Sequence, residues 1–168
     1  MLKPLRASAI RGRHGSFAII ASLYNAKYVD SMVDAAKSEL QRAKAKKIQV
    51  LRVPGAFEIP VVAARLAAGA QDFRAHAPRS RLHAPPDAII CFGVIFQGQT
   101  SHAQHIGWGV THALAKIQIQ YQIPVIHAVF VFEKEEQARV RCLGKKHNRG
   151  TEAARTALEM ARVMRKLR

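Results

Sequence analysis

The 168-residue sequence predicts an α/β fold in which a four-stranded parallel sheet has helices on both faces. Short apolar runs alternate along the chain with longer segments whose apolar residues recur at helical spacing. Strands that alternate with helices in this way are typical of a parallel sheet covered on both sides. Apolar residues make up 49% of the chain and charged residues 23%, which is the balance of a soluble globular protein.

The first half of the chain contains a predicted strand, a helix and a second strand. Residues 16–23 (SFAIIASL) form a continuous apolar run, which indicates a buried strand. Over residues 26–47 the apolar residues recur at helical spacing and form one face. Residues 48–53 form a short, largely apolar segment, which predicts the next strand. Before these elements, residues 1–15 are expected to be a basic N-terminal arm, and residues 16–168 a single domain.

A turn and a surface loop frame the next helix. Pro54 and Gly55 force a turn, and Pro60 is accepted only in the first turn of a helix, so a helix begins near it. Residues 72–86 are rich in Pro, Arg, His and Ala without periodicity, which predicts a surface loop. Residues 87–96 (DAIICFGVIF) then form a fully buried strand.

The last part of the chain continues the alternation of predicted helices and strands. A helical pattern follows His102 and continues to about Tyr121, and residues 124–132 form a strand that is buried apart from His127. Residues 133–143 are predicted to be a short helix. After a basic turn, the final helix has its apolar stripe at Ala153, Ala157, Met160, Met164 and Leu167.

Charge and composition limit the classes of function. The formal net charge is +16, from 27 Lys and Arg residues against 11 Asp and Glu residues, which favours anionic partners. No apolar run approaches the roughly 20 residues that span a bilayer, and no secretory signal is evident, so we expect a cytoplasmic protein without membrane contact. The two cysteines, Cys91 and Cys142, do not suggest a disulfide framework.

The carboxyl ends of the predicted strands should lie on one edge of the sheet, where open parallel sheets bind their ligands. This rule brings four segments together: Tyr24-Asn25, Ala56-Phe57-Glu58, residues 98–102 and the segment after Phe132. Four separate candidates on one edge indicate a site more strongly than any single motif does.

Residues 98–102 (GQTSH) connect the third predicted strand to a helix start. Unpaired backbone N–H groups and a partial positive charge at a helix start suit an anion such as phosphate. The same field disfavours a protonated imidazole, so His102 is biased towards neutrality and can exchange protons near pH 7. Gly-x-Thr-Ser is also ordinary helix-capping chemistry.

His102, His105 and His112 lie loosely on one helical face, but no carboxylate or thiolate shares that spacing, so no metal is expected.

Four motifs, in order, resemble the lumazine synthase family. They are residues 54–60 (PGAFEIP), Gly98-x-Thr100-x-His102, residues 136–141 (EQAxxR) and residues 148–154 (NRGTEAA). The resemblance implies a flavodoxin-like, three-layer sandwich and the activity of a transferase of riboflavin biosynthesis. It would condense 5-amino-6-(D-ribitylamino)pyrimidinedione with 3,4-dihydroxy-2-butanone 4-phosphate to 6,7-dimethyl-8-ribityllumazine, phosphate and water, without a cofactor. The family forms pentamers, often twelve in an icosahedral shell, with active sites between adjacent subunits; riboflavin synthase is a further candidate partner.

Residue by residue, the resemblance assigns His102 to proton transfer. The pyrimidinedione and ribityl chain would contact Tyr24, Asn25, Ala56, Phe57, Glu58, Val94, Ile95 and His127. The phosphate would be bound by Gly98, Gln99, Thr100 and, from the neighbouring subunit, Arg141. Arg149 and Glu152 would lie near the same site.

Two features depart from the family pattern. Phe96 and Gln97 fill a gap that the family commonly fills with one, often basic, residue, so the loop is one residue longer. His127 stands where the family often has a phenylalanine that covers the bound ring. The alternative function is therefore a non-catalytic, shell-forming relative that binds a flavin or lumazine. Nucleic-acid binding is not expected, because aromatic platforms and recognition motifs are missing from the sequence.

Overall fold

A parallel sheet of four strands in the order β2-β1-β3-β4 lies at the centre of the molecule. The computed structural model describes residues 15–74, 85–144 and 147–167. The strands are β1 (Ser16–Ser22), β2 (Lys47–Val53), β3 (Ala88–Phe96) and β4 (Val125–Phe132). The α/β fold with a four-stranded parallel sheet is thereby confirmed. The predicted N-terminal arm lies outside the described residues apart from Gly15.

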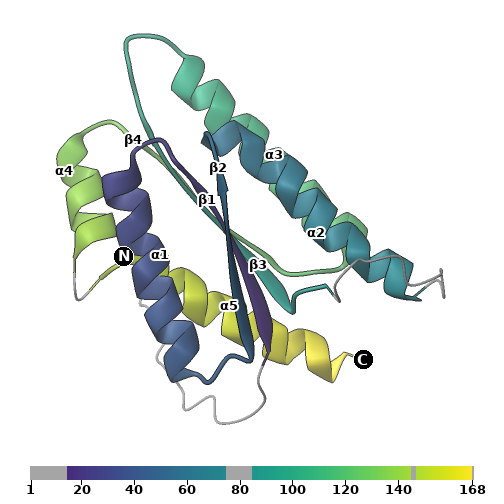
Figure 1. The fold of residues 1–168 in the computed structure, drawn as a ribbon. Coiled ribbons are helices and arrows are strands. Elements are labelled where there is room, and N and C mark those ends of the chain that lie inside the picture. The colour runs from purple at the N-terminus through teal and green to yellow at the C-terminus, as the bar shows by residue number, and fades with distance from the viewer. Residues whose placement is uncertain (1–14, 75–84, 145–146, 168) are drawn as a thin grey trace.

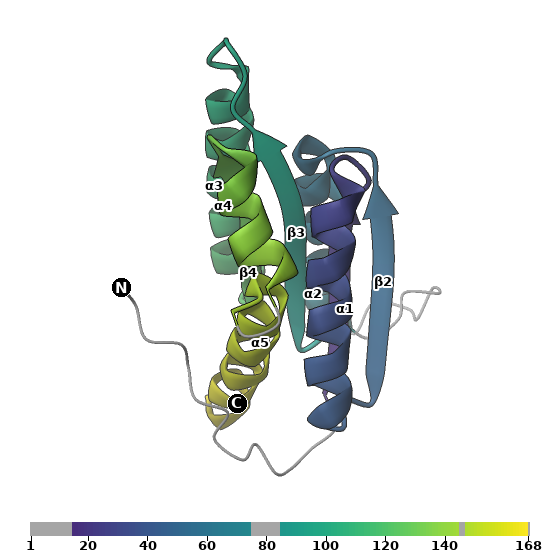
Figure 2. The ribbon, with the colours of Figure 1, turned by 90° about the vertical axis from the view of Figure 1, so that its left-hand side faces the viewer.

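Helices cover both faces of the sheet (Figures 1 and 2). One face carries α1 (Ala26–Arg42), α4 (Glu135–Ala138) and α5 (Arg149–Lys166), and the other carries α2 (Ile59–Arg74) and α3 (His102–Tyr121). Alternate side chains of each central strand enter opposite cores: Ile90 packs towards α1 and α5, and Ile89 towards α2 and α3. Both faces are thus buried, which explains why these strands are continuously apolar.

Helix α1 ends at Arg42, five residues before the predicted end at residue 47. Lys44 has a left-handed backbone with a φ of 58°. The Ala45 N–H donates to the Leu40 carbonyl at 3.0 Å, and the Lys44 N–H donates to the Gln41 carbonyl at 2.9 Å. This is a Schellman ending in which lysine occupies the position usually held by glycine. The sequence therefore lacks the residue that would have marked the end of the helix.

The region after β2 differs slightly from the prediction. A 3₁₀ turn, Ala56–Glu58, leads into α2, and Pro60 lies in the first turn of that helix as expected. The helix continues to Arg74, so the first residues of the predicted loop at 72–86 are helical. Residues 75–84 lie outside the described part of the chain.

The helix predicted over residues 133–143 is divided in two. Helix α4 is followed by a π-helical turn, Arg139–Leu143. The Ser31 hydroxyl donates to the Cys142 carbonyl at 2.8 Å, and the Asn148 amide nitrogen donates to the same carbonyl. The Asn148 side-chain oxygen also accepts from the Gly150 N–H at 2.8 Å and caps α5. Side chains distant in sequence thus hold the π-helical turn in place, and single π-turns are frequent at functional sites.

Both cysteines, Cys91 and Cys142, are buried free thiols. Within the described ranges, no helix combines the length and apolar character needed to cross a membrane.

Candidate active site

A cavity of about 500 Å³ opens at the carboxyl ends of β1, β2 and β3. Its volume falls in the range of small-molecule binding sites. The lining residues are Tyr24, Asn25, Gly55, Ala56, Phe57, Glu58, Val94, Ile95, Phe96, His102 and Ile106. The first three predicted segments of the sheet edge therefore contribute to one cavity.

Tyr24 and Asn25 are positioned by the loop that follows β1. The Leu23 N–H donates to the Val53 carbonyl at 2.8 Å, and the Tyr24 N–H donates to the Pro54 carbonyl at 3.1 Å. Asn25 adopts a left-handed backbone, and its side-chain nitrogen donates to the Val94 carbonyl at 2.7 Å. The Tyr24 side chain stays 69% exposed, so its ring is available to stack on a flat ligand.

The turn Ala56–Glu58 forms the adjacent wall. A Glu58 carboxylate oxygen accepts from the Gly55 N–H at 2.8 Å, which stabilises the start of the turn. A Cβ atom at residue 55 would lie 2.9 Å from that oxygen and 3.2 Å from the Tyr24 ring, so a larger residue would displace the Glu58 and Tyr24 side chains. Phe57 is 60% exposed beside the cavity. The wall offers an aromatic ring, a carboxylate and backbone groups to a polar ligand.

The loop 97–101 crosses from β3 to α3 between two lining residues, Phe96 and His102. Gly98, Gln99 and Thr100 are exposed on this loop and do not line the cavity itself. The Thr100 hydroxyl accepts weakly from the His102 N–H at 3.4 Å. The His102 ring makes no hydrogen bond within the described residues, which leaves both ring nitrogens available to a ligand.

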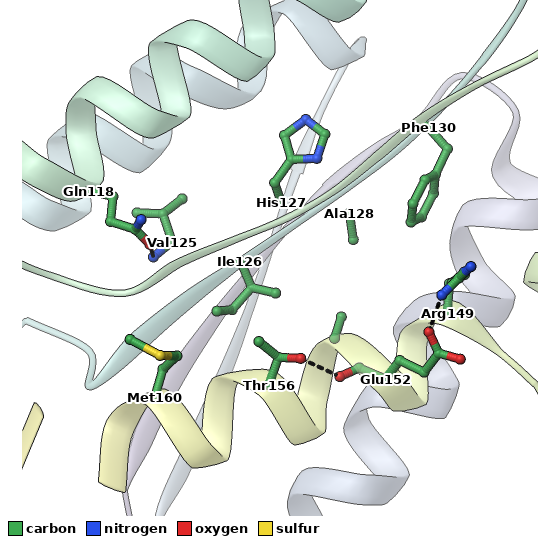
Figure 3. Close-up of a pocket in the computed structure, with 11 residues that line it drawn as sticks. Gln118, Val125, Ile126, His127, Ala128, Phe130, Arg149, Glu152, Thr156 and Met160 are labelled. Carbon is green, nitrogen blue, oxygen red and sulfur yellow. Dashed lines mark hydrogen bonds and ion pairs between the residues drawn. The ribbon is translucent and has the colours of Figure 1, made fainter. Parts of the chain in front are cut away.

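A second cavity of about 450 Å³ lies around the free edge of β4 (Figure 3). His127 points to the α3 side of the strand, whereas Ile126 points to the α5 side. The predicted residues Arg149 and Glu152 form an ion pair in this cavity. The remaining lining residues are Gln118, Val125, Ala128, Phe130, Ala153, Thr156 and Met160.

The protonation of His127 can be assigned from its partner. The Thr111 hydroxyl donates its proton to the Gly107 carbonyl at 2.7 Å, so it must accept from the His127 Nε2–H, 3.0 Å away. Partial burial of the ring lowers the pKa of His127 below its ordinary value of about 6.5. His127 is therefore a neutral, Nε2-protonated imidazole near pH 7.

Strand β4 is less buried than predicted. Besides His127, Val131 is 39% exposed and Phe130 is half-buried. The reason is that β4 is an edge strand, which the sequence order of the strands does not show. The edge leaves these side chains open beside the second cavity.

Arg141 lies on the π-helical turn and lines neither cavity. It is exposed, and within the described part of the chain its guanidinium forms no ion pair. Gly55, Phe96 and Ile106 line the first cavity but were not among the site residues predicted from the sequence. Ile106 follows His102 by one helical turn, and that spacing is a signal that could have identified it.

The predicted site residues therefore fall into separate groups on one chain. One group lines the cavity at the ends of β1 to β3, and another lines the cavity at β4, while the loop 97–101 and Arg141 present exposed groups. Within the described ranges, no group of three His, Cys, Asp or Glu side chains could hold a metal ion.

Comparison with known proteins gives a single family. The sequence profile of 6,7-dimethyl-8-ribityllumazine synthase matches residues 14–165. A protein named 6,7-dimethyl-8-ribityllumazine synthase from Stenotrophomonas maltophilia (strain R551-3) is 37% identical over 153 residues, which cover 90% of each chain. A protein of the same name from Xanthomonas campestris pv. campestris (strain B100) is 36% identical over 157 residues, covering 92% of this chain and 93% of its own.

Proposed function

The chain belongs to the 6,7-dimethyl-8-ribityllumazine synthase family, and on that premise we propose that it catalyses the family's reaction in riboflavin biosynthesis. The substrates are 5-amino-6-(D-ribitylamino)pyrimidinedione and 3,4-dihydroxy-2-butanone 4-phosphate, and phosphate and water leave. The observation that carries the proposal is that His102, Tyr24 and the Ala56–Glu58 turn line one cavity. Nothing in this geometry favours the non-catalytic alternative.

The first cavity is the proposed subsite for the pyrimidinedione and its ribityl chain. The exposed Tyr24 ring stacks on the electron-poor heterocycle. A polyol needs several directional partners, and the Ala56–Glu58 turn supplies backbone groups and one carboxylate. Val94 and Ile95, at the end of β3, contribute the apolar wall.

The loop 97–101 is the proposed phosphate subsite. Backbone amides at Gly98 and Gln99, the Thr100 hydroxyl and the partial positive charge of the α3 N-terminus favour the dianion. Arg141 of an adjacent copy adds a bidentate, charge-assisted contact, which its exposed guanidinium permits, since it has no ion pair among the described residues.

His102 is the proposed proton-transfer group. Imine formation, phosphate elimination and ring closure all move protons, and an imidazole near the substrates accepts and returns them. Holding the two substrates in register supplies much of the remaining acceleration. The residues of the cavity are expected to perform this chemistry without a cofactor.

A second copy of the chain is required in this proposal. His127, Arg149 and Glu152 lie in a cavity separate from the one that holds His102, so they reach the substrates only across a subunit boundary. We infer a pentamer, with twelve pentamers in an icosahedral shell as its larger form. Riboflavin synthase is the candidate partner, and the cytoplasm is the expected compartment.

The proposal is tested by mixing both substrates with the protein and following the fluorescence of the lumazine product. Wild-type protein should form it, and His102→Ala should slow turnover by about a hundredfold without abolishing it. His112→Ala, on the same helix but outside both cavities, is the matched control and should be near wild type. Unchanged turnover in His102→Ala would remove His102 from the mechanism.

A further inference from the structure

Gln97 is anchored by the sheet at the start of the loop 97–101. The strand pairing between β3 and β4 ends at Phe96 and Phe132. One further bond follows, because the Gln97 N–H donates to the Phe132 carbonyl at 2.8 Å. The backbone of Gln97 is therefore fixed before the chain enters the loop.

The side chain of Gln97 bridges the loop that follows it. Its amide nitrogen donates to the Thr100 carbonyl at 2.8 Å and to the Gly98 carbonyl at 3.1 Å. A carboxamide nitrogen carries two N–H groups, so both are used. Both partners are acceptors, which fixes the orientation of the amide.

These two hydrogen bonds determine the direction of two peptide groups. The described residues contain no cis peptide bond, and the C=O and N–H of a trans peptide point in opposite directions. Because the Gly98 and Thr100 carbonyls turn inward to Gln97, the N–H groups of Gln99 and Ser101 turn outward. Within the described residues, neither of these N–H groups has an acceptor.

We propose that Gln97 is a positioning residue that holds the Gln99 and Ser101 amides in the orientation that binds the phosphate of the butanone substrate. The inference rests on the proposed function and adds a role for the residue that lengthens the loop. Phe96 and His102 flank the loop and line the cavity, so the loop that carries the two amides begins and ends at residues of the cavity. Donors that are already oriented lose less conformational freedom when the anion binds.

The test compares Gln97→Met with wild type in steady-state kinetics. Methionine keeps the length of the side chain but cannot donate, so the loop loses two neutral hydrogen bonds. The KM for the butanone phosphate should rise about tenfold, while kcat and the KM for the pyrimidinedione stay within about twofold. Gln104→Met, an exposed glutamine in the first turn of α3, is the matched control and should behave as wild type.

Binding of inorganic phosphate, measured by calorimetry on the same variants, separates this inference from the proposed function. A phosphate affinity about tenfold weaker in Gln97→Met supports the positioning role even if wild-type protein forms no lumazine. Equal phosphate affinity in the two proteins overturns it, as does a wild-type protein that binds no phosphate. Similar losses for both substrates, together with a lower unfolding midpoint, also overturn it, because they indicate a general structural role.

Discussion

Asn25 and Glu58 each serve the fold and the candidate site at once. Asn25 ties the loop after β1 to the end of β3, and Glu58 stabilises the start of its own turn, yet both line the first cavity. The residue types and their place after strands were visible in the sequence. The Val94 partner of Asn25 was not, because it lies 69 positions away and depends on which strands become neighbours.

Substitution of Arg141 directly tests the contribution of one residue to phosphate binding. In Arg141→Lys the positive charge stays, but the bidentate geometry of the guanidinium is lost. The KM for the butanone phosphate should rise about tenfold with little change in kcat. Steady-state kinetics with this substrate varied at saturating pyrimidinedione measures both constants.

Arg139→Lys is the matched control for that experiment. Arg139 lies on the same π-helical turn and is exposed, and its ion pair with Glu136 at 3.6 Å tolerates a lysine. It should leave the KM unchanged. A normal KM in Arg141→Lys as well would exclude Arg141 from phosphate binding.

The lowered pKa of His127 predicts a pH dependence of stability. At pH values between the lowered pKa of folded His127 and the ordinary value of about 6.5, the ring is protonated in the unfolded chain but neutral in the folded one. The unfolded state therefore binds more protons in this range. This contribution to stability is present above about pH 6.5 and is lost as pH falls below it. Urea unfolding at pH 7 and pH 5 should show a smaller pH effect in His127→Phe than in wild type; identical pH effects would contradict the assignment.

At the scale of elements, the packing of α1 on α5 depends on Gly150. A Cβ atom at this position would lie 1.9 Å from the Met32 carbonyl oxygen, which belongs to the backbone of α1 and cannot rotate away. Gly150→Ala should therefore lower the free energy of unfolding by about 3 kcal/mol. Chemical denaturation monitored by circular dichroism measures this change.

Substitution of Gly109 should change the free energy of unfolding in the opposite direction and serves as the control. It lies inside α3, where a Cβ atom would meet the Phe57 ring at an ordinary 3.5 Å. Gly109→Ala should raise the free energy of unfolding by about 0.5–1 kcal/mol, because alanine favours the helix. If both variants shifted in the same direction, the close approach at Gly150 would not be the reason for the loss.

The central strands β1 and β3 were predicted within one residue because both of their faces are buried and each is one apolar run. The helix ends were less predictable. Lys44 ends α1 without a glycine, and the π-helical turn depends on Ser31 and Asn148, which contact it from other elements. The π-helical turn thus arises from tertiary contacts that local sequence does not encode, whereas the end of α1 is local but uses a residue that does not mark a helix end.

At the scale of the whole molecule, the parallel sheet brings the first three predicted segments to one cavity, whereas the segment after Phe132 lines neither cavity and other predicted residues line the second. The sequence predicted the edge, because all four strands run in one direction. The division into two cavities follows from the strand order, which places β4 at the free edge of the sheet.

Subunit mixing tests whether one site is shared between two copies. His102→Ala removes a residue of the first cavity, and Arg141→Ala removes one that the proposal takes from the neighbour. The two variants are then refolded together in equal amounts. About a quarter of wild-type activity should return, because random assembly places an intact His102 beside an intact Arg141 of the neighbouring copy at about a quarter of the sites. Activity no higher than the mean of the two pure variants would show that each chain carries a complete site.

The end of the β3–β4 pairing at Phe96 and Phe132 has an evolutionary consequence. An insertion inside β3 would exchange the side chains that enter the two cores, since alternate residues face opposite sides of a strand. The extra residue that the family pattern predicts for this loop would lie where the pairing stops, and there a longer loop disturbs neither core. Catalytic loops attached beyond the last paired residues are free to vary in length while the scaffold is inherited unchanged.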